Sequence, residues 1–186
     1  MPRLIVINGP PGCGKSTLAQ RYADGHPLAL NLDIDRLRSW IGGWRDDPGA
    51  AGVLARAMAL AAARAHLEAG YDVVIPQFLG RPEFLEQLED LARGTGARFG
   101  EIVLIDSKDN ALRRFAERGR QPAGTPAAQA HELAGHRGGN GELAAMYDQL
   151  MAVVAARPSA LVVPTSRGRV DEAYQDLLSA LSREAS

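Results

Sequence analysis

Residues 9–16 read GPPGCGKS, and this stretch decides the fold class of the chain. It fits the pattern G-x-x-x-x-G-K-[ST], between the apolar run RLIVIN at 3–8 and the helical pattern KSTLAQRYA at 15–23. Glycines let successive backbone N–H groups turn toward one concavity, and the helix that follows presents its positive N-terminus there. Such a concavity binds phosphate groups, so the stretch predicts a nucleotide-binding loop.

Each position of this loop has a predicted role in binding ATP and Mg²⁺. Lys15 supplies a positive charge for the β and γ phosphates, and Ser16 offers its hydroxyl to Mg²⁺. Only Lys15 and Lys108 are lysines, so the choice of lysine at position 15 is a rare one in this chain. The residues predicted to bind the nucleotide are Gly9, Pro10, Pro11, Gly12, Cys13, Gly14, Lys15, Ser16 and Thr17.

Strand and helix patterns alternate along the rest of the chain. This alternation predicts an α/β protein with the three-layer P-loop NTPase fold, in which helices cover both faces of a five-stranded parallel sheet. The 186 residues fit a single domain over 1–186. Strands are predicted at 3–8, 28–33, 71–75, 99–105 and 161–163, and helices at 15–23, 35–40, 50–69, 82–93, 108–118, 142–156 and 170–182.

The composition excludes several classes of function. The net charge is −1, so the strongly basic footprint of sequence-independent nucleic-acid binding is absent. A single cysteine allows neither an intramolecular disulfide nor a cysteine-based zinc site. No apolar run approaches the 18 residues of a membrane span, and the apolar start of the chain is too short for a signal peptide. We therefore expect a cytoplasmic protein; its oligomeric state is not indicated.

Two carboxylates, Asp33 and Asp35, follow the second predicted strand. The carboxyl ends of parallel strands face the ligand crevice, where a carboxylate accepts a substrate proton or holds the Mg²⁺ shell. The alternatives are a surface carboxylate for Asp33 and a helix N-cap for Asp35. We assign Asp35 the role of general base and Asp33 a role at the metal. Asp106, after the fourth predicted strand, is the alternative acidic site.

GPPGCGKST followed by DIDRLR resembles the P-loop kinase superfamily, and more closely the branch of polynucleotide kinases, zeta-toxin-like kinases and chloramphenicol phosphotransferases. The resemblance implies an Asp-x-x-Arg element in which Asp35 is the base and Arg38 helps to hold the acceptor. The stretch at 70–88 is also similar to tunicamycin-resistance ATP-binding proteins. One departure is Gln77, because many relatives have an acidic residue at the end of this strand, and an amide cannot replace that charge.

Arg114 and Arg118 lie four residues apart on one face of a predicted helix, just before a segment rich in Gly, Pro, Ala and His. The resemblance implies that arginines at this place reach the phosphates or the adenine, and Arg118 is assigned a catalytic role. The alternative is a solvated helix face. The segment at 119–141 is predicted to be a mobile lid or a loosely packed helix pair.

The only tryptophans, Trp40 and Trp44, follow the acidic pair. They either line an acceptor pocket or pack beneath the alanine-rich helix at 50–69, and packing is the simpler interpretation.

These observations predict an ATP- and Mg²⁺-dependent kinase that phosphorylates a hydroxyl of a small molecule, such as an antibiotic, or of a nucleotide. The alternative is a protein that binds ATP or hydrolyses it slowly, as a switch or resistance factor, and Gln77 is its best support. A motor ATPase is disfavoured, because the chain is short and no strand of the hhhhDE type is evident.

Overall fold

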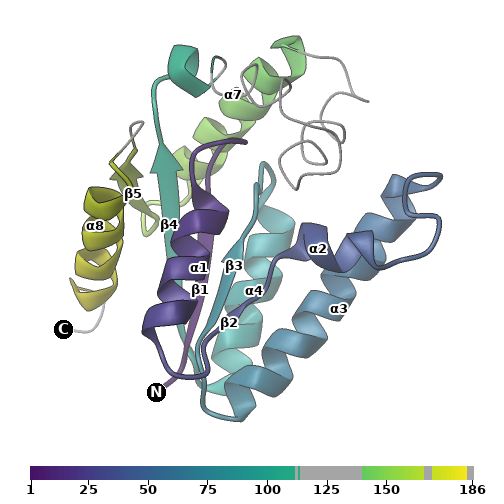
Figure 1. The fold of residues 1–186 in the computed structure, drawn as a ribbon, viewed down its shortest axis with the longest axis vertical. Helices are drawn as coiled ribbons and strands as arrows, with labels where there is room; N and C mark the ends of the chain where they lie inside the picture. Colours follow the sequence, from purple (N-terminus) through teal and green to yellow (C-terminus); the bar gives the residue numbers. More distant parts are fainter. Residues whose placement is uncertain (112, 114–139, 166–168, 184–186) are drawn as a thin grey trace. The chain divides into compact units, whose positions relative to one another are not determined.

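Five strands form one parallel sheet in the order β2-β3-β1-β4-β5 (Figure 1). The computed structural model describes residues 1–111, 113, 140–165 and 169–183. The predicted α/β class with a five-stranded parallel sheet is confirmed. The strands are β1 (Arg3–Asn8), β2 (Leu30–Asn31), β3 (Val73–Pro76), β4 (Arg98–Ile105) and β5 (Leu161–Pro164).

The chain divides into two compact units, each assembled from separate stretches of sequence. The N-terminal unit consists of Met1–Ile7, Ser16–Gln77 and Glu83–Glu101, and the C-terminal unit of Asn8–Lys15, Phe78–Pro82 and Ile102–Ser186. The prediction of a single domain over 1–186 stays a prediction. The helices are α1 (Lys15–Gly25), α2 (Ile34–Ser39), α3 (Pro48–Glu68), α4 (Pro82–Thr95), α7 (Asn140–Ala156) and α8 (Val170–Arg183).

The core of the N-terminal unit lies on both faces of its strands. Figure 1 shows α1 in front of β1 and α4 behind β3. Fully buried residues of β1 and β3 meet the apolar sides of these helices, which bury Leu18 and Tyr22 of α1 and Leu85 and Leu88 of α4. Strands that are apolar on both faces are typical of a parallel sheet covered by helices.

Helix α3 buries a row of small side chains. Asp47 caps its N-terminus by accepting from the Ala50 N–H at 2.9 Å, and Pro48 occupies the first turn, where its missing N–H is not needed. The buried residues recur every four positions, as Ala51, Ala55, Ala59, Ala63 and Leu67. This spacing places them in one row along the helix, so α3 presents a narrow face of methyl groups.

The second predicted strand is shorter than 28–33, and this prediction is wrong at both ends. Leu28 has a φ of +57°, and the Ala29 N–H donates to the His26 carbonyl at 3.1 Å, so a turn precedes the strand. At the other end Asp33 is the N-cap of α2. Only Leu30–Asn31 pairs with β3.

Proline ends two strands in a similar way. Pro76 stands opposite Ile7 in the register of β1 and β3, and the Gln77 N–H donates to the Ile7 carbonyl at 3.1 Å. In the C-terminal unit Pro164 stands opposite Ile105, and the Thr165 N–H donates to the Ile105 carbonyl at 2.8 Å. The residue after each proline thus provides the N–H for the last rung of its ladder.

Candidate functional site

The loop at 9–14 follows a path that requires glycine. Gly9, Gly12 and Gly14 have φ values of +150°, +88° and +101°, a region that favours glycine. A Cβ at Gly9 would lie 2.7 Å from the Cys13 Sγ and 2.7 Å from the carbonyl oxygen of Leu104. The loop therefore has the backbone form that its sequence predicts.

Lys15 opens α1 and holds its ammonium group against the loop. Its Nζ donates to the carbonyl oxygens of Gly9 and Pro10, each at 2.9 Å. The side chains of Ser16 and Thr17, in the first turn of α1, are exposed. A cation above the loop, next to a helix N-terminus, gives the electrostatic conditions under which phosphate oxygens bind.

Asn8, the last residue of β1, is a buried residue next to this loop that the sequence did not single out. Its side chain is 0% exposed, and its Nδ2 donates to the Leu79 carbonyl at 3.0 Å. Its Oδ1 accepts from the N–H of Leu79 at 2.9 Å and from that of Gly9 at 2.8 Å. The amide thereby joins the start of the loop to the segment after β3. A polar residue at the end of the apolar run RLIVIN was the signal that could have identified it.

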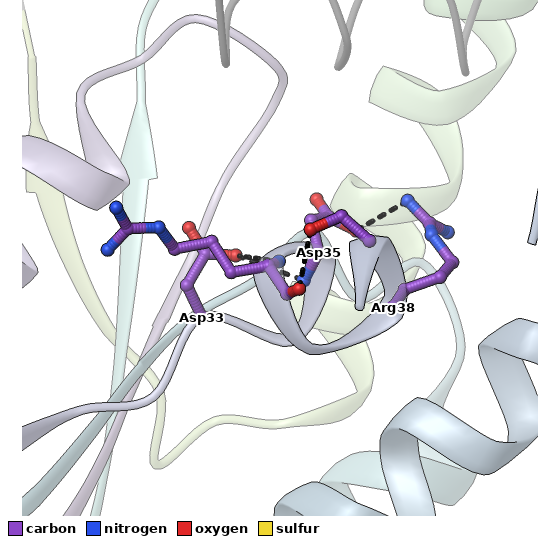
Figure 2. A network of polar contacts seen from close by, with 5 residues as sticks. Asp33, Asp35 and Arg38 are labelled. Atoms are coloured by element: carbon purple, nitrogen blue, oxygen red, sulfur yellow. Dashed lines mark hydrogen bonds and ion pairs between the residues drawn. The ribbon is translucent and has the colours of Figure 1, made fainter. Parts of the chain in front are cut away.

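Asp33 is the N-cap of α2 in the N-terminal unit, and Figure 2 shows its carboxylate at the start of that helix. Its Oδ1 accepts from the N–H of Asp35 at 3.0 Å and from the N–H of Arg36 at 3.3 Å. The alternative interpretation of Asp35 as the cap is therefore wrong, since the strand ends early enough for Asp33 to take that position.

Burial raises the pKa of the Asp33 carboxyl above its ordinary value, and the nearby Asp35 carboxylate raises this pKa further. The two capping N–H groups and Arg36 act in the opposite direction, because they favour the ionised form. The pKa of Asp33 is raised overall, so burial and repulsion by Asp35 outweigh the two capping hydrogen bonds and Arg36.

Asp35 forms an ion pair with Arg38, one turn later in α2 (Figure 2). Arg38 Nη2 donates to Asp35 Oδ1 at 2.7 Å, and the two side chains are 19% and 46% exposed respectively. An ion pair this exposed stabilises a fold by only about 0–1 kcal/mol. The Asp-x-x-Arg spacing thus places Asp35, the predicted base, in an ion pair with Arg38, the residue predicted to hold the acceptor.

The two tryptophans have opposite environments. Trp44 is 8% exposed, whereas Trp40 is 74% exposed, so the expectation that both pack in the core is wrong for Trp40. The Arg38 Cζ lies 5.6 Å and the Arg45 Cζ 4.5 Å from the centroid of the Trp44 ring. Both distances are within the range of cation–π attraction.

Gln77 and Asp106 both carry polar atoms that are shielded from solvent. Gln77 Oε1 is buried and accepts no hydrogen bond from the residues that the structure describes. Asp106 Oδ1 accepts from the N–H of Ser107 at 2.7 Å and from Asn110 Nδ2 at 2.8 Å, which shapes the turn after β4. At least one oxygen of Asp106 is thus already engaged within its own turn.

The chemistry of the predicted Mg²⁺ ligands fits that ion, although the protein donors are few. Magnesium prefers oxygen ligands and keeps several waters, with substrate phosphates completing its shell. Ser16 is exposed, and Asp33 uses Oδ1 for its cap, which leaves Oδ2 for a metal-bound water. Within the described ranges no three His, Cys, Asp or Glu side chains gather as a metal site, so nucleotide and water would have to supply the other ligands.

The predicted residues fall into two groups, each described within its own unit. Gly9 to Lys15 lie in the C-terminal unit, and Ser16, Thr17, Asp33, Asp35 and Arg38 in the N-terminal unit. Arg114, Arg118 and all but the last two residues of the predicted lid at 119–141 lie outside the described residues. In the part of the chain that the structure describes, no helix is both long and apolar enough to span a membrane.

A parallel sheet with a glycine loop and a lysine-led helix after its first strand defines the P-loop NTPase fold. The family model AAA_33, described as an AAA domain, matches residues 4–137, and the chain belongs to this family. The resemblance to P-loop kinases predicted from the motifs is confirmed.

Solved structures share this fold over nearly the whole chain. A gluconokinase from Sinorhizobium meliloti 1021 is 19% identical with a TM-score of 0.63, over 99% of this chain and 94% of the gluconokinase. The Deinococcus radiodurans tunicamycin resistance protein is 17% identical with a TM-score of 0.58, over 96% of this chain and 95% of that protein. Identities this low show the fold alone.

A curated relative matches over a short stretch only. The genome polyprotein of Feline calicivirus is 39% identical over 46 residues, which are 23% of this chain and 3% of the polyprotein. The chain thus covers a very small part of that relative's length.

Proposed function

We propose that this chain is an ATP- and Mg²⁺-dependent kinase that transfers the γ-phosphoryl group to a hydroxyl of a small molecule or nucleotide. The observation that carries the proposal is the loop at 9–14 with Lys15, which combines the glycine-dependent backbone with a cation held over it. Kinase-like relatives of the same fold support phosphoryl transfer as the reaction type.

The proposal gives each residue a distinct task. Lys15 binds the β and γ phosphates, and the loop N–H groups bind their oxygens. Asp35 accepts the proton of the acceptor hydroxyl, while Arg38 holds the acceptor and orients the Asp35 carboxylate. Mg²⁺, when bound, neutralises the phosphate charge, and Ser16 and Asp33 are its proposed protein contacts. Arg114 and Arg118 stay predicted phosphate contacts.

The acceptor remains to be found by transfer of label from γ-labelled ATP. The first panel contains gluconate and tunicamycin, because similar folds belong to a gluconokinase and a tunicamycin resistance protein. Nucleosides, aminoglycosides, amphenicols and sugars, all of which carry hydroxyl groups, complete the panel.

Because the reaction uses ATP, we also propose a cytoplasmic location.

The only two lysines provide a matched pair of variants for this experiment. Lys15→Ala is expected to abolish transfer. Lys108→Ala also removes one positive charge, but Lys108 pairs with Asp148 at 2.7 Å, and this variant is expected to keep phosphoryl transfer. Equal transfer by both variants would contradict the proposal.

The second candidate is an ATP-binding protein that hydrolyses ATP slowly, and Gln77 favours it. A carboxamide cannot serve as a base or match a carboxylate on Mg²⁺. If label from ATP appears only as inorganic phosphate across the whole panel, and Lys15→Ala stops that release, this second function is correct.

A further inference from the structure

Trp44 is a buried indole in the turn between α2 and α3. The backbone N–H of Trp44 donates to the Ile41 carbonyl at 3.3 Å, and Gly43 before it has a φ of +66°. These contacts fix the turn, and burial of Trp44, which is 8% exposed, restrains its ring close to the end of the helix that carries Asp35 and Arg38. A ring held in this way offers its face as a rigid surface.

The guanidinium of Arg38 lies near both this ring and Asp35. Its Nη2 pairs with Asp35 at 2.7 Å, and its Cζ lies 5.6 Å from the ring centroid. Its Nε is buried and has no hydrogen-bond partner among the described residues. A planar guanidinium with one ion pair and one unpaired buried donor needs a further contact to fix its plane, and an aromatic face provides it.

We propose that Trp44 is a positioning residue, which holds the Arg38 guanidinium in place beside Asp35 for binding of the acceptor. The inference rests on the proposed function, since it assigns Trp44 an effect on phosphoryl transfer that acts through Arg38. The Cζ of Arg45 is 4.5 Å from the same ring, but this residue is exposed, and among the described residues it is Arg38 that pairs with Asp35. The acceptor therefore meets an arginine whose orientation is set before it arrives.

The first arm of the test observes Arg38 directly and needs no acceptor. In the full chain labelled with ¹⁵N-arginine, the Arg38 Nε proton is expected to be displaced by the indole ring current and protected from exchange. Trp44→Leu is expected to remove both effects, and Trp44→Phe to keep the protection. Trp40→Leu is the matched control, because this tryptophan is 74% exposed, and it is expected to change neither.

The second arm measures kinetics with MgATP and the panel compound that takes the label. Trp44→Leu is expected to raise the KM for that compound about tenfold, because Arg38 is misplaced, with the KM for ATP changed less than about twofold. Trp44→Phe is expected to restore most of the loss. A purely structural role would instead lower kcat through a smaller folded fraction, with both KM values unchanged.

The outcomes separate the two proposals. An Arg38 Nε proton that exchanges freely in the unsubstituted chain overturns the inference, even if Trp44→Leu fails to fold. An unchanged acceptor KM in a folded Trp44→Leu variant overturns it as well. If the unsubstituted chain transfers label to no compound, the proposed function fails instead, and the spectra alone decide whether Trp44 holds Arg38.

Discussion

Asn8 joins two stretches of chain that are 71 residues apart through a single buried amide. Removing that amide leaves the Leu79 N–H and carbonyl without their partner in a buried place. A buried polar group left without a hydrogen bond costs about 1–3 kcal/mol. The residue therefore matters both for stability and for the position of the loop that follows it.

Asn8→Ala is expected to lower the free energy of unfolding by at least about 1–3 kcal/mol, measured by denaturant titration. The control is Asn31→Ala, since Asn31 Nδ2 bonds the exposed Gln20 side chain at 3.0 Å, and we expect a change within about 0.5 kcal/mol. Equal effects of the two variants would show that the Asn8 bonds are not what stabilises this junction.

Asp35→Asn is expected to lower phosphoryl transfer by about 10²-fold with ATP affinity little changed, because the amide cannot accept the proton. Asp90→Asn is the matched control: Asp90 pairs with Arg93 at the same i, i+3 spacing and at 2.7 Å, on the surface of α4. Steady-state rates and calorimetry of ATP binding measure the two effects. Full activity of Asp35→Asn would place the base elsewhere.

The raised pKa of Asp33 predicts a dependence of stability on pH. The native chain binds this proton more tightly than the unfolded chain does. Its contribution is fully present below the unfolded pKa of about 3.9 and is lost as the pH rises through the folded-state pKa. Relative to Asp33→Asn, which still caps the helix, the unsubstituted chain should be less stable at about pH 7 than at about pH 4.

Chemical denaturation of both chains over this pH range, without Mg²⁺, measures the difference. The comparison cancels the titration of groups that both chains share. A difference that stays constant with pH, or that favours the unsubstituted chain more at pH 7 than at pH 4, would contradict the shift.

At the scale of the element, α3 depends on small side chains along its buried row. Ala59→Leu places a large side chain where the alanine is 0% exposed, and overpacking of this kind costs about 1–3 kcal/mol. Ala61→Leu adds the same side chain at an exposed position of the same helix, so helix propensity changes equally. In thermal unfolding, we expect Ala59→Leu to melt at a clearly lower temperature than Ala61→Leu. Equal melting temperatures would contradict close packing along this row.

At the scale of the whole molecule, nucleotide binding should stabilise the folded chain. MgATP at about 100 times its Kd adds about 2.7 kcal/mol to the free energy of unfolding, which corresponds to a rise in Tm of about 5–10 °C. Lys15→Ala should lose this rise and Lys108→Ala should keep it, as scanning fluorimetry with and without MgATP can show. A rise retained in Lys15→Ala would mean that the loop is not the ATP site.

The fold was predictable from the sequence because its information is local. Apolar runs, alternating elements and the loop motif each occupy one short stretch, so the strands and helices could be placed. The shortened second strand could not be predicted, because the positive φ of Leu28 is a conformation that its residue type disfavours.

The candidate site was predictable only in part. The loop and the Asp-x-x-Arg pair each occupy a few consecutive residues, so both could be found from the sequence, while their predicted roles stay predictions. The Asn8–Leu79 bonds span 71 residues, and the pairing of one tryptophan rather than the other with Arg38 depends on which indole is buried. Neither follows from spacing along the chain.

The prolines that end β3 and β5 have a consequence for how the chain reaches its fold. If β3 slipped by one residue toward the end of β1, the nitrogen of Pro76 would face the Ile7 carbonyl in place of the Gln77 N–H, and that rung would be lost. The same holds for Pro164 against Ile105 in the other unit. Each proline thus disfavours the neighbouring misaligned pairing, because that register lacks a hydrogen bond that the observed register makes with β1 or β4.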